Sequence, residues 1–122
     1  MFTQVRSANR RVSPVEDNKH KVVIKAVYVV LEPQYQNSLT EAARSINKMN
    51  GPVGVDLSGY LIEELRNEKN YADFKVDIAS ADIFVASLIF IEDLAQKVVE
   101  AVTPYKEKLK ASIVFPLSLI HI

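Results

Sequence analysis

The chain has 122 residues, 48% of them hydrophobic, and its 15 Lys and Arg residues balance 15 Asp and Glu residues. This length and hydrophobic content suit one domain with a buried core. The zero formal charge gives no overall field that would attract nucleic acid or an anionic membrane. The chain has no cysteine and only two histidines, His20 and His121, so we expect no disulfide, thiolate nucleophile, iron–sulfur site or zinc site. The composition fits a reducing, cytosol-like compartment.

The first 20 residues are charged, poor in apolar side chains and without the apolar core of a secretory signal. Three arginines in this segment would suit an organelle transit sequence, but two acids follow them closely. We therefore expect residues 1–20 to form a flexible, solvated leader. The longest apolar run, Ile83 to Ile91, is too short to cross a membrane, because a helical span needs about 20 residues.

Four apolar runs predict strands. Val22 to Leu31 is β-branched and apolar almost throughout, which is typical of a strand covered on both faces of a parallel sheet. Val53 to Leu57 alternates apolar and other residues and predicts a shorter strand. Ile83 to Phe90 is a second fully apolar run, and Ser112 to Phe115 is predicted as the last strand.

Helical stripes separate these runs. The first stripe, from Leu39 to Met49, stops at Asn50-Gly51. Between the second and third strands, the apolar spacing predicts two short helical pieces joined around the stretch NEKN. After the third strand, a stripe from Leu94 to Leu109 contains Pro104, so this helix must kink there or restart with Thr103 as its cap.

The alternation of strands and helices predicts an α/β domain, a flavodoxin-like or Rossmann-like wound parallel sheet. In a flavodoxin-like sheet, the strand order would be 2-1-3-4. The pattern stops after the fourth strand, where the apolar hexapeptide LSLIHI follows without a covering helix. We therefore divide the chain into the leader (1–20), an incomplete, truncated α/β domain (21–116) and a doubtful tail (117–122).

The loops of the predicted sheet lack the common phosphate-binding signatures. The loop after the first strand, EPQYQNS, contains no glycine, whereas dinucleotide and P-loop motifs need glycine so that backbone N–H groups can close around phosphate. A phosphorylation receiver would place two adjacent acids at the end of the first strand, where this chain has Glu32 followed by Pro33. The sequence also contains no Ser-His-Asp, Cys-His or metal-ligand helix motif. We predict no catalytic residue and no bound metal or cofactor in this chain.

Acids at the predicted carboxyl ends of the strands form the first candidate site. Glu32 ends the first strand, and Glu92 and Asp93 follow the third. Glu92 and Asp93 suit the first turn of a helix, where each acid interacts favourably with the helix dipole by about 0.3 to 1 kcal/mol. Alternatively, the three carboxylates form an acidic rim for a cation or a basic partner, because ligands of wound sheets gather at this edge.

A second candidate lies in the stretch SGYLIEELRN, Ser58 to Asn67, which mixes apolar and charged residues. Tyr60, Glu63 and Glu64 would supply a partner-docking face. An ordinary amphipathic turn of helix explains the same pattern equally well.

Four blocks of sequence resemble one known family. They are AVYVVLE, SGYLIEELRN, NYADF and, above all, the 20-residue block ASLIFIEDLAQKVVEAVTPY, Ala86 to Tyr105. Together they resemble the extreme N-terminal domain of the magnesium-chelatase H subunit, one of the CobN-like large chelatase subunits. The resemblance covers about Met1 to Pro116, and the start MFTQV is more similar to a cyanobacterial form than to a plant precursor.

The resemblance implies a much longer protein that binds protoporphyrin IX and inserts Mg²⁺ in chlorophyll biosynthesis, while separate AAA+ ATPase I and D subunits hydrolyse ATP. The implied partners are the remainder of the H subunit, the I and D subunits and protoporphyrin IX, with no nucleic acid and no transmembrane segment. Mg²⁺, ATP and the porphyrin belong to the full complex, and we expect none of them on this fragment. The implied location is the cyanobacterial cytoplasm or the chloroplast stroma.

The sequence departs from the family after Pro116, where LSLIHI stands in place of a Ser-Met-Pro-type segment. The family's catalytic groups are expected in later domains, so no catalytic residue is carried over. Two alternatives remain open at this point: a stand-alone flavodoxin-like binding or regulatory module, and a fragment of the cobaltochelatase large subunit.

Overall fold

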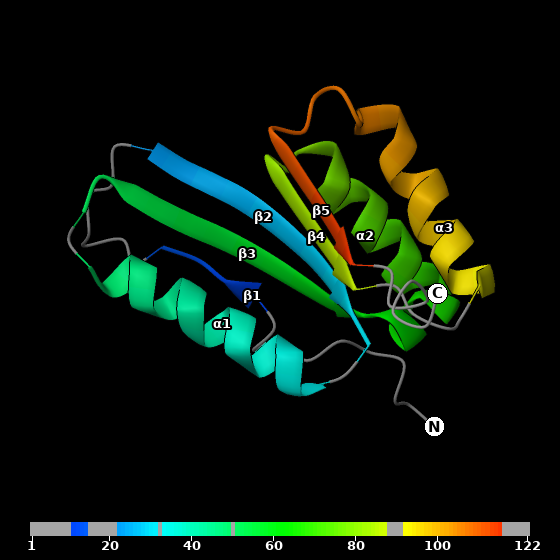
Figure 1. The fold of residues 1–122 in the computed structure, drawn as a ribbon, viewed down its shortest axis with the longest axis horizontal. Helices are drawn as coiled ribbons and strands as arrows, with labels where there is room; N and C mark the ends of the chain where they lie inside the picture. Colours follow the sequence, from blue (N-terminus) through cyan, green and yellow to red (C-terminus); the bar gives the residue numbers. More distant parts are fainter. Residues whose placement is uncertain (1–10, 15–21, 32, 50, 88–91, 116–122) are drawn as a thin grey trace.

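The computed structural model describes residues 11–14, 22–31, 33–49, 51–87 and 92–115 and shows an α/β domain (Figure 1). Its strands are β1 (Arg11–Val12), β2 (Val22–Val30), β3 (Val53–Leu61), β4 (Ile83–Ser87) and β5 (Ala111–Phe115). Its helices are α1 (Pro33–Lys48), α2 (Glu68–Ala79) and α3 (Glu92–Val102), with the 3-10 turns η2 (Ile62–Arg66) and η3 (Thr103–Tyr105).

The described strands form one sheet in the order β1-β3-β2-β4-β5. β2, β3, β4 and β5 pair in parallel, and their order is 2-1-3-4 when the four are numbered along the chain, as in a flavodoxin-like sheet. β2 pairs with β3 along all nine residues, from Val22↔Val53 to Val30↔Leu61, but pairs with β4 only from Ala26 onwards. The amino-terminal parts of β2 and β3 therefore extend past β4 as a two-stranded ribbon beside α1 (Figure 1). The prediction of an α/β fold with this parallel core is confirmed.

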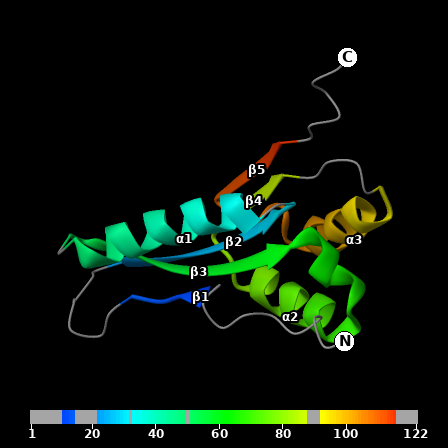
Figure 2. The same cartoon turned by 90° about the horizontal axis from the view of Figure 1, so that it is seen from below.

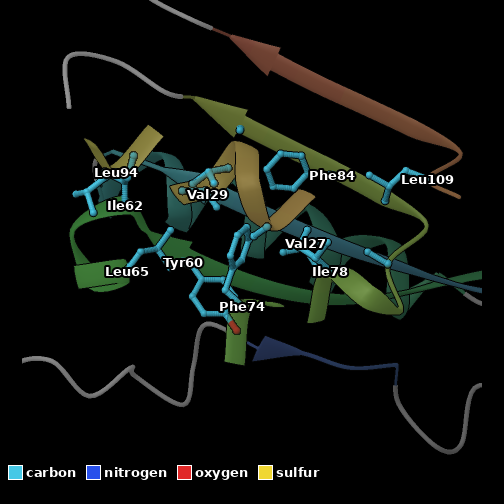
Figure 3. Close-up of a cluster of buried hydrophobic side chains, with 14 residues drawn as sticks. Val27, Val29, Tyr60, Ile62, Leu65, Phe74, Ile78, Phe84, Leu94 and Leu109 are labelled. Carbon is cyan, nitrogen blue, oxygen red and sulfur yellow. The ribbon is translucent and has the colours of Figure 1, made fainter. Parts of the chain in front are cut away.

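Helices cover both faces of the sheet, and Figure 2 shows α1 on one side and α2 on the other. Side chains alternate along β2, so that Val27 and Val29 lie in the larger core with α2 and α3. Tyr28 and Val30 lie in the smaller core with α1. Figure 3 shows the larger cluster, in which the rings of Tyr60 and Phe74 meet edge to face with centroids 5.2 Å apart. This alternation explains why the first strand is apolar at nearly every position.

Three helix predictions are confirmed. Two pieces, η2 and α2, separate β3 from β4, and Asn67 caps α2 by accepting a hydrogen bond from the Asn70 backbone N–H at 3.0 Å. α3 ends at Val102 and the chain restarts as η3 with Pro104 inside it. None of the described helices is long and apolar enough to cross a membrane.

Two details differ from the sequence prediction. β3 continues to Leu61, not Leu57, because its last four residues pair in register with Val27 to Val30. Part of the expected leader is also ordered, since Arg11–Val12 forms β1 and pairs antiparallel with Ser58 and Leu57 of β3. Leu88 to Phe90, the predicted end of the third strand, and the tail at 117–122 lie outside the described residues.

Candidate functional site

The predicted acidic rim lies at the edge where the carboxyl ends of β2, β3 and β4 meet. α3 begins at Glu92, so the prediction that Glu92 and Asp93 start a helix is confirmed. Asp93 lies in the first turn with its side chain 69% exposed, which is a favourable place for an acid beside the helix dipole. Glu32 lies outside the described residues. That Glu32 lies close to Glu92 and Asp93 therefore stays a prediction.

An arginine, which sequence reasoning missed, neutralises part of this rim. Arg66 Nε donates to Glu63 Oε1 at 2.8 Å, and Arg66 Nη1 donates to Asp93 Oδ2 at 3.4 Å. The hydrogen bond that Arg66 donates to Glu63 is the main cause that raises the pKa of Arg66, and the negative charges of Glu63 and Asp93 add to this. These two ion pairs, Glu63–Arg66 and Arg66–Asp93, link η2 to the start of α3. All three side chains are at least half exposed, so solvent screens these contacts.

The structure changes the interpretation of the proposed docking face. Tyr60 is fully buried and donates a hydrogen bond from Oη to Asp77 Oδ2 at 2.6 Å. Glu64 is also buried, and its Oε1 accepts the backbone N–H of Leu61 at 2.8 Å, which caps η2. Neither side chain is presented to a partner. Of the three predicted docking residues, only Glu63 is exposed.

A second group of charged and polar side chains, the Asp77 cluster, surrounds Asp77 of α2. We define it as Arg11, Lys25, Asp56, Ser58, Tyr60 and Asp77. Lys25 Nζ lies 3.5 Å from Asp77 Oδ1 and donates to Ser80 Oγ at 2.8 Å. Arg11 donates to Asp56 Oδ2 at 3.2 Å and to Ser58 Oγ at 3.1 Å, and its Nη1 lies 3.9 Å from Asp77 Oδ1.

The Asp77 cluster lies on the α2 face of the sheet, where Lys25 and Asp56 are register partners near the amino ends of β2 and β3. An open groove of about 270 Å³ borders it, lined by Arg11, Asp73, Val76 and Asp77. Asp56 and Asp77 each have a cation within 4 Å, and Asp77 is buried. This balance of buried opposite charges is typical of a structural ion-pair network.

The sequence carried a signal for this cluster. Lys25 interrupts the apolar run of β2, and Asp56 interrupts the alternation of β3. A charged residue within an otherwise buried strand needs a partner, because an unpaired buried charge is costly. The partners are 45 to 52 residues apart in sequence, so that signal could not identify them.

The geometry contains no metal centre among the residues that the structure describes: no three His, Cys, Asp or Glu side chains are placed to hold an ion together. Among the described acids of the two candidate sites, Asp93 pairs with Arg66, Asp56 with Arg11, and Asp77 with Lys25. Chemically, these groups can hold elements together and present charge to a partner.

Comparison with known proteins agrees with the resemblance seen in the sequence. Residues 25–120 match the family described as a domain of unknown function, DUF3479. The chain is 46% identical over 120 residues to "Magnesium-chelatase subunit ChlH, chloroplastic" from Oryza sativa subsp. indica, and equally to the protein of that name from Oryza sativa subsp. japonica. The match covers 95% of this chain but only 9% of each relative. These relatives do not favour the alternatives of a stand-alone module or a cobaltochelatase fragment. The chain belongs to the DUF3479 family and is similar to the N-terminal region of the ChlH proteins.

Proposed function

We propose that this chain is the N-terminal domain of a magnesium-chelatase H subunit and that it contributes assembly contacts to that subunit. The observation that carries the proposal is the 46% identity to the ChlH proteins, which extends over 95% of the chain. An identity of this size over almost the entire chain supports a shared role.

In this proposal, the complete protein inserts Mg²⁺ into protoporphyrin IX, and partner I and D subunits hydrolyse ATP. It works in the chloroplast stroma or in a bacterial cytoplasm. Metal insertion needs a base that accepts pyrrole N–H protons and ligands that strip water from Mg²⁺, an ion that dehydrates reluctantly. We assign these groups to other parts of the subunit, because two described acids of the candidate sites are held by cations: Asp93 by Arg66, and Asp77 by Lys25.

The exposed chain Glu63–Arg66–Asp93, together with Glu92 at the start of α3, is the proposed contact surface for the rest of the H subunit or for its ATPase partners. The side chains of Glu63, Arg66 and Asp93 are exposed and of mixed charge, as at the polar rim of a protein interface. Such rim charges mainly influence how fast partners associate and how salt affects them.

The test is the double variant Glu92→Ser with Asp93→Asn, made in a full-length H subunit that carries this chain. We expect the ATPase-subunit concentration for half-maximal Mg²⁺ insertion to rise several-fold, and the rate at saturating partner to stay unchanged. The fold should lose only about 1 to 2 kcal/mol, because Ser and Asn still cap a helix. The rate of Mg²⁺ insertion is measured from the change in porphyrin fluorescence.

The matched control is Glu41→Gln on α1, which removes an exposed acid that pairs with Arg44 at 3.1 Å. It should change neither quantity. A lower rate at saturating partner, with an unchanged half-maximal concentration, would contradict the proposal by placing Glu92 and Asp93 in the metal-insertion site.

A second prediction concerns the isolated chain. Titration with Mg²⁺ by isothermal calorimetry should show no tight, stoichiometric binding, and the chain alone should neither hydrolyse ATP nor insert Mg²⁺. The reason is that Mg²⁺ gives up its hydration water reluctantly and is usually held by one or two carboxylates together with substrate phosphates, whereas the carboxylate of Asp93 pairs with Arg66. Tight binding that disappears in the Glu92→Ser, Asp93→Asn variant would overturn the prediction.

A further inference from the structure

The shortest strand of the sheet is attached through both of its side chains. β1 consists of Arg11 and Val12, which pair antiparallel with Ser58 and Leu57. Val12 is 6% exposed and lies in the smaller core with Leu57. Arg11 points to the opposite face, where it contacts Asp56, Ser58 and Asp77. A two-residue strand is thus held by one apolar and one ionic anchor.

The edge of β3 beside this strand is closed by a different device. The side chain of Asn47 donates to the Val55 carbonyl at 2.9 Å and accepts the Val55 N–H at 2.7 Å. The backbone groups of Val55 therefore face the edge of the sheet. Because backbone groups alternate between the two sides of a strand, those of Leu57 face the same edge and those of Ser58 face β2. The backbone N–H and C=O of Leu57 are therefore shielded from solvent by β1.

The ionic anchor of β1 is accessible to solvent. The side chain of Arg11 is 48% exposed, whereas that of Asp77 beneath it is 11% exposed. Salt screens exposed charge pairs, and a segment with few buried contacts opens at a lower free energy than the core. Opening of β1 would expose the backbone edge of β3. It would also expose the carboxylates of Asp56 and Asp77 on one face of the sheet and the apolar site of Val12 on the other.

We propose that β1 is a detachable strap. It opens without unfolding of the rest of the domain, and it uncovers a receptor for an extended segment that carries Arg followed by an aliphatic residue. Arg11 and Val12 are the occupant of this receptor in the structure. The chemistry of recognition is strand addition to an edge, combined with one ionic and one apolar pocket. This inference does not rest on the proposed chelatase function.

The test is amide hydrogen exchange of the intact chain, measured by NMR for Leu57 and Ser58. In Arg11→Gln, we expect exchange of the Leu57 amide to become about tenfold faster, because a charge-assisted anchor is lost. The Ser58 amide, which faces β2, should stay as slow as in the unchanged chain. Raising NaCl from about 0.05 M to about 1 M, where the screening length falls to about 3 Å, should have the same effect on the unchanged chain.

The receptor is tested by adding the peptide SANRRVSPV, residues 7–15 of this chain, to the Arg11→Gln variant. The peptide should slow exchange at Leu57 again, and the same peptide with Gln in place of Arg11 should not. Arg44→Gln, which removes the exposed partner of Glu41, is the control and should leave Leu57 unchanged. Equal acceleration of Leu57 and Ser58, no acceleration in Arg11→Gln, or no protection by the peptide would each overturn the proposal.

Discussion

We expect Gly59→Ala to lower the free energy of unfolding by about 3 kcal/mol, the size of a severe overpacking defect. Gly59 of β3 is the register partner of Tyr28 of β2, and the Tyr28 ring lies across it. A Cβ at Gly59 would overlap the ring atoms Cζ and Cε2 and the phenolic oxygen of Tyr28. Tyr28 is only 1% exposed, so its ring has no free space into which it can move. An aromatic ring placed over a glycine in this way is a known means of stabilising a sheet.

Urea unfolding followed by circular dichroism measures this effect. The control is Gly51→Ala, since a Cβ at Gly51 meets no heavy atom within 4 Å. It should change stability by less than about 0.5 kcal/mol or stabilise slightly, because alanine reduces the entropy of the unfolded chain. The double variant Gly59→Ala with Tyr28→Val should be less destabilised than the sum of the two single variants. Equal stability of the two alanine variants would show that Tyr28 moves aside without cost.

Asp77→Ala should also cost about 3 kcal/mol, because it breaks a buried ion pair and leaves its partners without their acceptor. The fully buried phenol of Tyr60 would lose its hydrogen bond to the carboxylate at 2.6 Å. Lys25, whose side chain is 20% exposed, would keep its contact with Ser80 but lose its counter-charge. Asp77→Asn should cost about half as much, because the amide oxygen can still accept from Tyr60.

The matched control lies one turn earlier on the same helix. Asp73 pairs with Lys69 at 3.7 Å and its side chain is 47% exposed, so Asp73→Ala should change stability by less than about 0.5 kcal/mol. Chemical unfolding of the three variants in parallel gives the comparison. If Asp77→Ala were as mild as Asp73→Ala, water would have to solvate Tyr60 and Lys25 in the altered protein, and the Asp77 cluster would not be a structural network.

The elements that the sequence predicts well are those whose cause is local. The apolar run correctly predicts the strand β2, and Val27 to Val30 are buried as expected of a covered parallel strand, whereas Val22 and Val23 are 53% and 49% exposed. The start of α3 at Glu92 follows from an acid pair placed directly before a helical stripe. The restart at Pro104 follows from the fixed geometry of proline. The strand order was not fixed in this way, because right-handed crossovers allow both the flavodoxin-like order found here and the Rossmann order.

The functional surfaces were less predictable, because their residues meet only in the folded chain. Arg66 lies 27 residues from Asp93 in sequence. The residues around Asp93 therefore gave no sign that Arg66 would pair with this acid of the predicted rim. Tyr60 and Glu64 looked like members of an exposed amphipathic turn. The extension of β3 to Leu61 turned Tyr60 inwards, towards Asp77, while Glu64 became a cap.

By itself, then, the sequence determined the α/β class, the four parallel strands, the start of α3 and the resemblance to the chelatase H subunit, because each depends on residues close together along the chain. Only the tertiary structure decided that Arg11 and Val12 form an edge strand, that Gly59 lies under Tyr28, and that Asp77 is the centre of a buried network. Arg11 and Asp56 are 45 residues apart, and Lys25 and Asp77 are 52 apart. Contacts at such separations form only when loop closure brings the strands together, and the register of β2 against β3 then selects which side chains meet.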